Sequence, residues 1–285
     1  SWIVTIYLVV GVVSIPVFGK LGDIYGKKKM LVYAILIYSI MVTVTGFSRE
    51  LSDSIYLMIV FRALQGIAMC MFPLAFSLIR DEFPRDRIAI AQGVISAMFG
   101  VGTAVGFVLG GYVTDALGWQ WTYHTVAPFA FIVTITVMFK VRESPVRLKA
   151  KVDYIGAAIL GSMMVSFLVG ITETRERGWA DPLVIGLLVL ALVLLFAFAF
   201  WIKRVQEPLV RPALLKVRNL ALMNVVAFVI GFSLFSTNQT VASLAGFNFR
   251  LDAIGIGLLM LPMSIVTLFF GPTVGFLVRK IGPKW

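Results

Sequence analysis

The fold is decided by residues 1–48, which read SWIVTIYLVVGVVSIPVFGKLGDIYGKKKMLVYAILIYSIMVTVTGFS. Two charge-free runs, 1–19 and 30–48, flank a short segment that carries four lysines and one aspartate. About 20 consecutive apolar residues are needed for a helix to cross a hydrocarbon core of roughly 30 Å. The stretch therefore predicts two antiparallel membrane helices joined by a tight, basic hairpin.

The same pattern continues along all 285 residues. Further runs without Asp, Glu, Lys or Arg occupy 88–114, 116–139, 154–172, 182–202, 219–249 and 253–278, and the run 54–79 is interrupted only by Arg62. The chain is 60% hydrophobic and only 14% charged, which disfavours soluble enzymes, disulfide-stapled secreted domains and disordered proteins. Continuous rather than alternating apolar runs disfavour a membrane β-barrel. We predict an all-α integral membrane protein with nine transmembrane helices.

The net charge of +11 has a topological explanation. Of the 25 basic residues, 20 lie in one set of alternating loops, four lie in the opposite loops, and Arg62 is the one that remains. The positive-inside rule places the basic loops in the cytoplasm, so we expect a multi-pass protein of the cell membrane with Ser1 outside and Trp285 inside. The lipid bilayer, rather than nucleic acid, is then the partner of the positive charge. The odd number of spans and the lack of an initiator methionine lead us to expect a piece of a longer chain.

Residues for metal, redox or enzymatic chemistry are scarce. Cys70 is the single cysteine and His124 the single histidine, and no CxxC or HExxH spacing occurs. These counts predict no disulfide within the chain, no metal site and no cofactor. Because no span contains a carboxylate or a Cys-His pair, we also expect no enzymatic activity.

The basic hairpin contains Gly19-Lys20-Leu21-Gly22-Asp23-Ile24-Tyr25-Gly26-Lys27-Lys28-Lys29. Its plain interpretation is a glycine turn whose charges fix topology. The order of residues, however, resembles the G-x-L-x-D-x-x-G-[RK]-[RK] loop between helices 2 and 3 of the Major Facilitator Superfamily, with Ile24 where that family usually has a basic residue. The resemblance implies a conformational latch formed by Gly19, Asp23, Gly26, Lys27 and Lys28.

A second copy of the hairpin begins at Gly275 and ends at Lys284, with Arg279 in the place of Asp23. Two related hairpins predict pseudo-repeated halves. Eight spans end between them, whereas a protein of six plus six helices would have six, and the two additional spans resemble the helix pair inserted in the fourteen-helix drug:proton antiporter branch. We therefore expect an N-terminal half at 1–140 with helices 2 to 6, a cytoplasmic linker and inserted pair at 141–205, and the start of the C-terminal half at 206–285.

Arg62 is the one charge inside a span, and Gln65 and Gly66 follow it on the same helix face. A charged residue at mid-membrane costs about 2.5–3.5 kcal/mol on insertion scales, so Arg62 should face the bundle interior or a wet cavity. A structural arginine bonded to backbone carbonyls would satisfy the same rule. The stretch resembles the R-x-x-Q-G signature of helix 4, with Ala68 in place of a further glycine, and the resemblance implies a role for Arg62 and Gln65 in proton coupling.

Span 88–114 holds six glycines, of which Gly102, Gly106 and Gly110 recur every four residues. Such spacing forms a groove for close helix packing. Together with Gly93 and Gly111 it also resembles the antiporter motif on helix 5 of drug:proton exporters, although Phe107 occupies the place of that motif's proline.

Substrate contacts are less clearly marked. Asn238 and Gln239 are amides within span 219–249 and should face the bundle, either as bonds between helices or as substrate contacts. Proton antiport requires a titrating group inside the membrane, and no Asp or Glu lies in a span. Either that group lies outside this chain or coupling works differently.

The resemblance implies a secondary transporter that exports lipophilic small molecules or drugs, coupled to protons and working by alternating access as a monomer. An importer or facilitator of another small solute, and a membrane sensor that kept the fold without transport, are the alternatives, because fold does not fix substrate.

Overall fold

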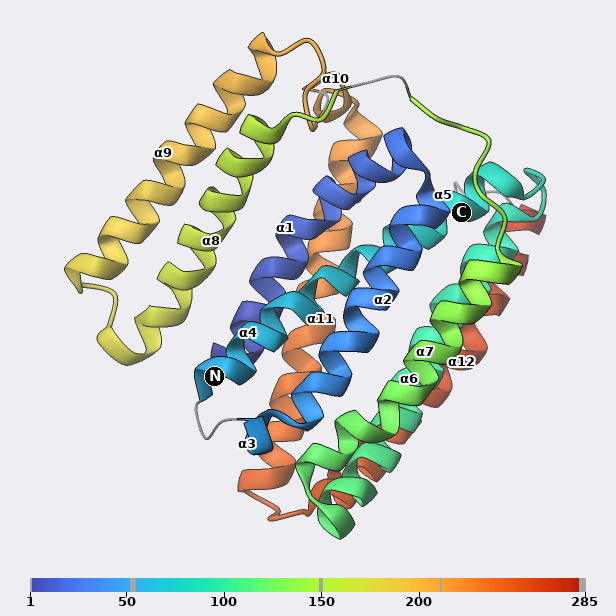
Figure 1. Ribbon diagram of the computed structural model, residues 1–285, viewed down its shortest axis with the longest axis vertical. Helices are drawn as coiled ribbons and strands as arrows, with labels where there is room; N and C mark the ends of the chain where they lie inside the picture. Colours follow the sequence, from blue (N-terminus) through green and yellow to red (C-terminus); the bar gives the residue numbers. More distant parts are fainter. Residues whose placement is uncertain (1, 52–54, 149–150, 211, 282–285) are drawn as a thin grey trace. The chain divides into compact units, whose positions relative to one another are not determined.

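A computed structural model describes residues 2–51, 55–148, 151–210 and 212–281 (Figure 1). The regular structure of these residues is helical throughout. The long helices are α1 (Trp2–Tyr25), α2 (Lys27–Gly46), α6 (Ile88–Leu117), α7 (Trp119–Lys140), α8 (Tyr154–Arg177), α9 (Pro182–Arg204), α11 (Arg218–Phe247) and α12 (Ala253–Ile281). The segment from Ile55 to Glu82 is built from α4 (Ile55–Gly66), the 3-10 turn η1 (Ile67–Cys70) and α5 (Met71–Glu82). Two further helices, α3 (Ser48–Leu51) and α10 (Pro212–Leu215), are short.

The predicted membrane bundle is confirmed. Seven of the long helices and the continuous segment Ile55–Glu82 are long and apolar enough to cross a membrane, judged by length and composition. The ninth predicted span corresponds to α12, whose apolar part covers Ile254–Phe270.

The predicted hairpin loop at 20–29 is almost entirely helical, which corrects the sequence-based expectation. Helix α1 continues to Tyr25, α2 begins at Lys27, and Gly26 is the one residue between them. Charge-free runs mark the part of a helix that lies in hydrocarbon, whereas long charged side chains at the interface still favour helical backbone and extend toward water.

The first compact unit comprises Ser1–Leu78 and Val126–Lys216. Its apolar core is formed where α2 packs against η1 and α5, with Ala34 and Cys70 fully buried at the centre. In Figure 1 helices α8 and α9 form an antiparallel pair. A Cβ added at Gly161 of α8 would lie 3.2 Å from Val13 of α1, so the pair is attached to the unit through closely packed helices.

The second compact unit comprises Ile79–Thr125 and Val217–Trp285. Helices α6 and α12 lie side by side in it. The hydroxyls of Thr103 and Ser264 are 3.2 Å apart between these helices, and a Cβ at Gly257 would come within 2.7 Å of the Phe107 carbonyl oxygen. The division of the chain into regions 1–140, 141–205 and 206–285 stays a prediction.

Candidate functional site

The junction between α1 and α2 depends on the backbone of Gly26. Its φ of 117° and ψ of 130° lie in a region that residues with a side chain rarely adopt. The Gly26 amide donates to the Gly22 carbonyl at 3.0 Å, and its carbonyl accepts from the Met30 amide at 3.1 Å. One glycine therefore reverses the chain while hydrogen bonding continues on both sides.

A carboxylate from a distant part of the chain caps α2. The Glu143 side chain accepts hydrogen bonds from the backbone amides of Lys28 at 2.9 Å and Lys29 at 3.2 Å, and also from that of Ser144 at 3.1 Å. The first amides of a helix have no partner within the helix and carry partial positive charge, so an acid here is stabilising. A Cβ at Gly26 would lie 2.5 Å from Oε2 of Glu143, so this approach requires glycine.

The charged members of the predicted latch lie together at this junction. Lys27 Nζ is 3.4 Å from Oδ1 of Asp23, and the lysine side chain is only 2% exposed. The backbone carbonyl of Asp23 accepts a 2.7 Å hydrogen bond from the Leu148 amide. A Cβ at Gly19, by contrast, would meet nothing within 4 Å. The junction is thus fixed by the segment that follows α7.

Glu143 was not identified from the sequence as a functional residue. The available signal was an acid between Arg142 and Arg147 in a loop that is otherwise mostly basic. Neither composition nor spacing indicates that the chain returns to α2 at this point, because 115 residues separate Glu143 from the amide of Lys28. The repeat of the hairpin is only partly visible, since Gly282 to Lys284 lie outside the described residues.

Arg62 and Gln65 belong to a polar network inside the bundle. Arg62 Nη1 donates to Oε1 of Gln65 at 3.3 Å. Gln65 Nε2 donates to Oγ1 of Thr45 at 2.6 Å and to the Met41 carbonyl at 3.2 Å, so the network connects α4 to α2. Gln65 and Thr45 are 1% and 0% exposed. The structure therefore brings the two predicted coupling residues together and adds Thr45, which sequence analysis did not single out.

Gly66 faces a different neighbour from Gln65. A Cβ at Gly66 would meet the backbone carbonyl oxygen of Tyr7 and lie 3.1 Å from the Gly11 amide nitrogen, both on α1. Close backbone approach of this kind is what small residues allow in membrane bundles. The R-x-x-Q-G stretch thus holds α1 through its glycine and α2 through its glutamine.

The glycines of the predicted packing motif on α6 differ in their exposure. Gly102 and Gly106 are exposed, Gly93 and Gly110 are half-buried, and Gly111 is buried. A Cβ at Gly102, Gly106 or Gly110 would meet nothing within 4 Å. Gly100 of the same helix does approach α12, since a Cβ there would lie 2.9 Å from the Ser264 carbonyl oxygen.

The predicted substrate residues lie on α11. Asn238 is half-buried and its Nδ2 donates to the Leu234 carbonyl of the same helix at 2.8 Å, while Gln239 is exposed. The Asn238 bond stays within α11, and substrate contact by these two amides stays a prediction.

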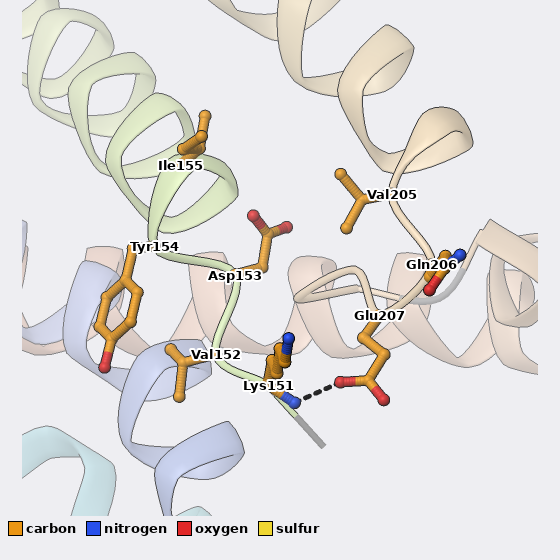
Figure 2. Close-up of a pocket in the computed structure, with 8 residues that line it drawn as sticks. All are labelled: Lys151, Val152, Asp153, Tyr154, Ile155, Val205, Gln206 and Glu207. Atoms are coloured by element: carbon orange, nitrogen blue, oxygen red, sulfur yellow. Dashed lines mark hydrogen bonds between the residues drawn. The ribbon is translucent and has the colours of Figure 1, made fainter.

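A cavity of about 800 Å³ opens where α8 begins and α9 ends (Figure 2). The buried carboxylate of Asp153 accepts from the Gly156 amide at 2.7 Å, from Trp201 Nε1 at 3.0 Å and from the Leu209 amide at 3.3 Å. The Lys151 amide donates to Glu207 across the cavity mouth. Asp153 therefore joins both helices of the pair to the segment that follows, which explains an aspartate and a glycine three residues apart at the start of α8.

The geometry is one of membrane helices joined by buried polar contacts, and comparison with known proteins identifies the family. The family model of the Major Facilitator Superfamily matches residues 1–285. Multidrug resistance protein 3 of Bacillus subtilis is 25% identical over 99% of this chain and 54% of its own length. Multidrug transporter protein MdtP of the same organism is 27% identical over 100% and 52%. Tetracenomycin C resistance and export protein of Streptomyces glaucescens is 26% identical over 99% and 52%. The chain spans about half the length of these relatives, and the match over all of its residues shows that it belongs to the Major Facilitator Superfamily.

Proposed function

We propose that the protein is a secondary transporter that exports lipophilic small molecules or drugs across the cell membrane by alternating access, coupled to protons and active as a monomer. The relatives that carry multidrug or export names support this substrate class. The distribution of basic residues supports an outside N-terminal end and a cytoplasmic C-terminal end for the chain. A transporter of this family binds its substrate without transforming it.

The observation that carries the proposal is the network of Arg62, Gln65 and Thr45. A guanidinium within an apolar span is costly, and the network supplies one of the polar partners that such a group requires. Because Gln65 is bonded to two atoms of α2, a change at Arg62 would act on that second helix through Gln65. A charged group joined to two helices can respond to protonation of a nearby site by changing how those helices pack.

In this proposal Asp23, Lys27 and Lys28 form part of a cytoplasmic latch, together with Gly19 and Gly26. Glu143 and Leu148 bond the backbone on either side of the junction, so movement of the segment after α7 would be transmitted to α1 and α2. The α6 glycines give that helix a smooth face, and Asn238 with Gln239 contributes polar groups toward the substrate.

The central experiment replaces Arg62 in the full-length protein. Arg62→Met should reduce efflux of a lipophilic cationic dye about tenfold or more, the change that follows from a loss of roughly 1.4 kcal/mol of barrier stabilisation. Arg177→Met is the matched control, since Arg177 is half-exposed at the end of α8 and pairs with Glu173. Both variants should reach the membrane in equal amounts. Full efflux by Arg62→Met would refute the coupling role.

Proton coupling is tested separately in cells whose proton gradient is collapsed by an ionophore while ATP is maintained. Efflux by the unaltered protein should stop, whereas a facilitator would continue until the dye concentrations are equal. Asp23→Asn should lower the rate of efflux without preventing membrane insertion, because it removes the charge paired with Lys27. Unchanged efflux in Asp23→Asn would contradict the latch.

A further inference from the structure

A small basic cavity lies between the first turns of α2 and the segment that follows α7. Its volume is about 340 Å³. Lys28, Lys29 and Arg147 contribute three positive charges to its lining, and Glu143 is the acid among the described residues that line it. The formal charge of this lining is therefore +2, and it is concentrated at one end of two membrane helices.

The carboxylate of Glu143 is already engaged by backbone groups. It accepts from the amides of Lys28, Lys29 and Ser144, as described above. In the part of the chain that the structure describes, no Asp or Glu oxygen lies within 4.0 Å of the charged groups of Lys28, Lys29 or Arg147. Glu143 thus holds the two lysines in place by their backbones and leaves their ammonium groups available to an anion.

The wall of the cavity toward the middle of the helices is apolar. It is formed by Val32 and Tyr33 of α2 and Met138 of α7. Tyr33 and Met138 are each 45% exposed, although both stand on helices that are long and apolar enough to cross a membrane. Lys29 Nζ lies 5.9 Å from the centroid of the Tyr33 ring, where a tyrosine marks the boundary between apolar and polar surroundings.

We propose that this cavity binds an anionic phospholipid of the cytoplasmic leaflet, with the headgroup phosphate between Lys29 and Arg147 and an acyl chain along Tyr33 and Met138. A free phosphate ion would use the cations but leave the apolar wall uncovered, whereas a phospholipid matches both. Basic pockets between membrane helices on the cytoplasmic side are suited to such headgroups. The proposal rests on the orientation given above but not on transport.

Bound lipid would also act on the junction at Gly26. The headgroup would contact the side chains of Lys28 and Lys29, whose backbone amides Glu143 already binds, so the first turn of α2 would be held through both its backbone and its side chains. Anionic lipid should then stabilise the α1–α2 junction more than a zwitterionic lipid does.

The test compares lipids bound to the purified full-length protein by native mass spectrometry. Phosphatidylglycerol and phosphatidylcholine of the same acyl chains are supplied in equal amounts. The unaltered protein should retain phosphatidylglycerol preferentially, and Lys29→Gln combined with Arg147→Gln should reduce that preference about thirtyfold, as expected for the loss of two interfacial cations. Both residues are exposed, so the double variant should remain folded.

A matched control removes two cations from the end of α9 instead. Lys203→Gln combined with Arg204→Gln changes the net charge by the same amount and should keep the preference for phosphatidylglycerol. Lys29→Arg combined with Arg147→Lys retains both charges and should also keep it. Equal losses in the two double glutamine variants would refute a specific site, because the preference would then follow net charge alone.

Inorganic phosphate distinguishes the two sources of the anion. Added in large excess over the lipid, it should leave phosphatidylglycerol bound because it cannot replace the acyl contacts. Release of the lipid by phosphate at constant ionic strength, or an unchanged preference in the variant that lacks Lys29 and Arg147, would overturn the proposal.

Discussion

Gly66 of α4 and the spaced glycines of α6 belong to two different motifs of the sequence, and they have opposite surroundings. Gly66 lies against the backbone of α1, so a single added carbon would meet the Tyr7 carbonyl oxygen. At Gly102, Gly106 and Gly110 an added carbon would meet nothing within 4 Å. The comparison teaches that a glycine pattern on a membrane helix shows where a close approach is possible, whereas contact with another helix shows where it is used.

The largest expected effect is that of Gly66→Ala. The atoms in the way belong to the backbone of α1, so α1 and α4 must separate, and overpacking of this kind costs about 1–3 kcal/mol. We expect a loss near the upper end in the free energy of unfolding, measured by tryptophan fluorescence during denaturation in detergent micelles. A variant as stable as the unaltered protein would show that α1 and α4 are not held together at this glycine.

Gly26→Ala should have the second largest effect on the free energy of unfolding, mainly because of the backbone conformation of Gly26. The backbone at φ 117° is strained for alanine by about 1–3 kcal/mol, and the new carbon would also displace the Glu143 carboxylate. Gly19→Ala is the matched control in the same motif, because Gly19 is helical with open space around it, and it should retain full stability. Equal losses of stability in Gly26→Ala and Gly19→Ala would contradict this explanation, because the requirement for glycine would then not be confined to the turn.

The polar contact beside Gly66 is expected to contribute less. Thr45→Val and Gln65→Leu should each destabilise the protein, and the double variant should lose less than the sum, with a coupling energy of about 1 kcal/mol, as is found for hydrogen bonds between membrane helices. The hydroxyl pair of Ser39 and Thr134, 3.1 Å apart between α2 and α7, offers a second cycle in the same unit. Strict additivity at Thr45 and Gln65 would contradict the network.

The smallest effect is expected at the open glycines. Gly102→Ala and Gly106→Ala should change the free energy of unfolding by less than about 0.5 kcal/mol, or raise it slightly, since alanine favours helix more than glycine does. Gly100→Ala, on the face that meets α12, should cost more. A large loss at Gly102 in the full-length protein would show that another segment fills the groove, and would make the two glycine sites alike.

The order of the residues predicts the elements of the fold better than their boundaries and contacts. Runs without charge located the membrane helices, because the hydrocarbon core excludes charge along a whole span. The same runs misplaced the end of α1, since Lys20 and Asp23 are compatible with helix at the interface. Arg62 and Gln65 were paired correctly because residues three apart share a helix face. Thr45 and Glu143 were missed, because each reaches its partner from another element.

The sequence by itself determined that this is a helical membrane protein with basic residues gathered on one side. Burial in lipid constrains every residue of a span, so each span appears in the sequence as a continuous run without charges. The tertiary structure alone decided which glycines are in contact, which acid caps α2, and that Lys28, Lys29 and Arg147 line one cavity. Those contacts join residues as far as 115 positions apart, and contacts over such distances do not produce a periodic pattern from which they could be predicted.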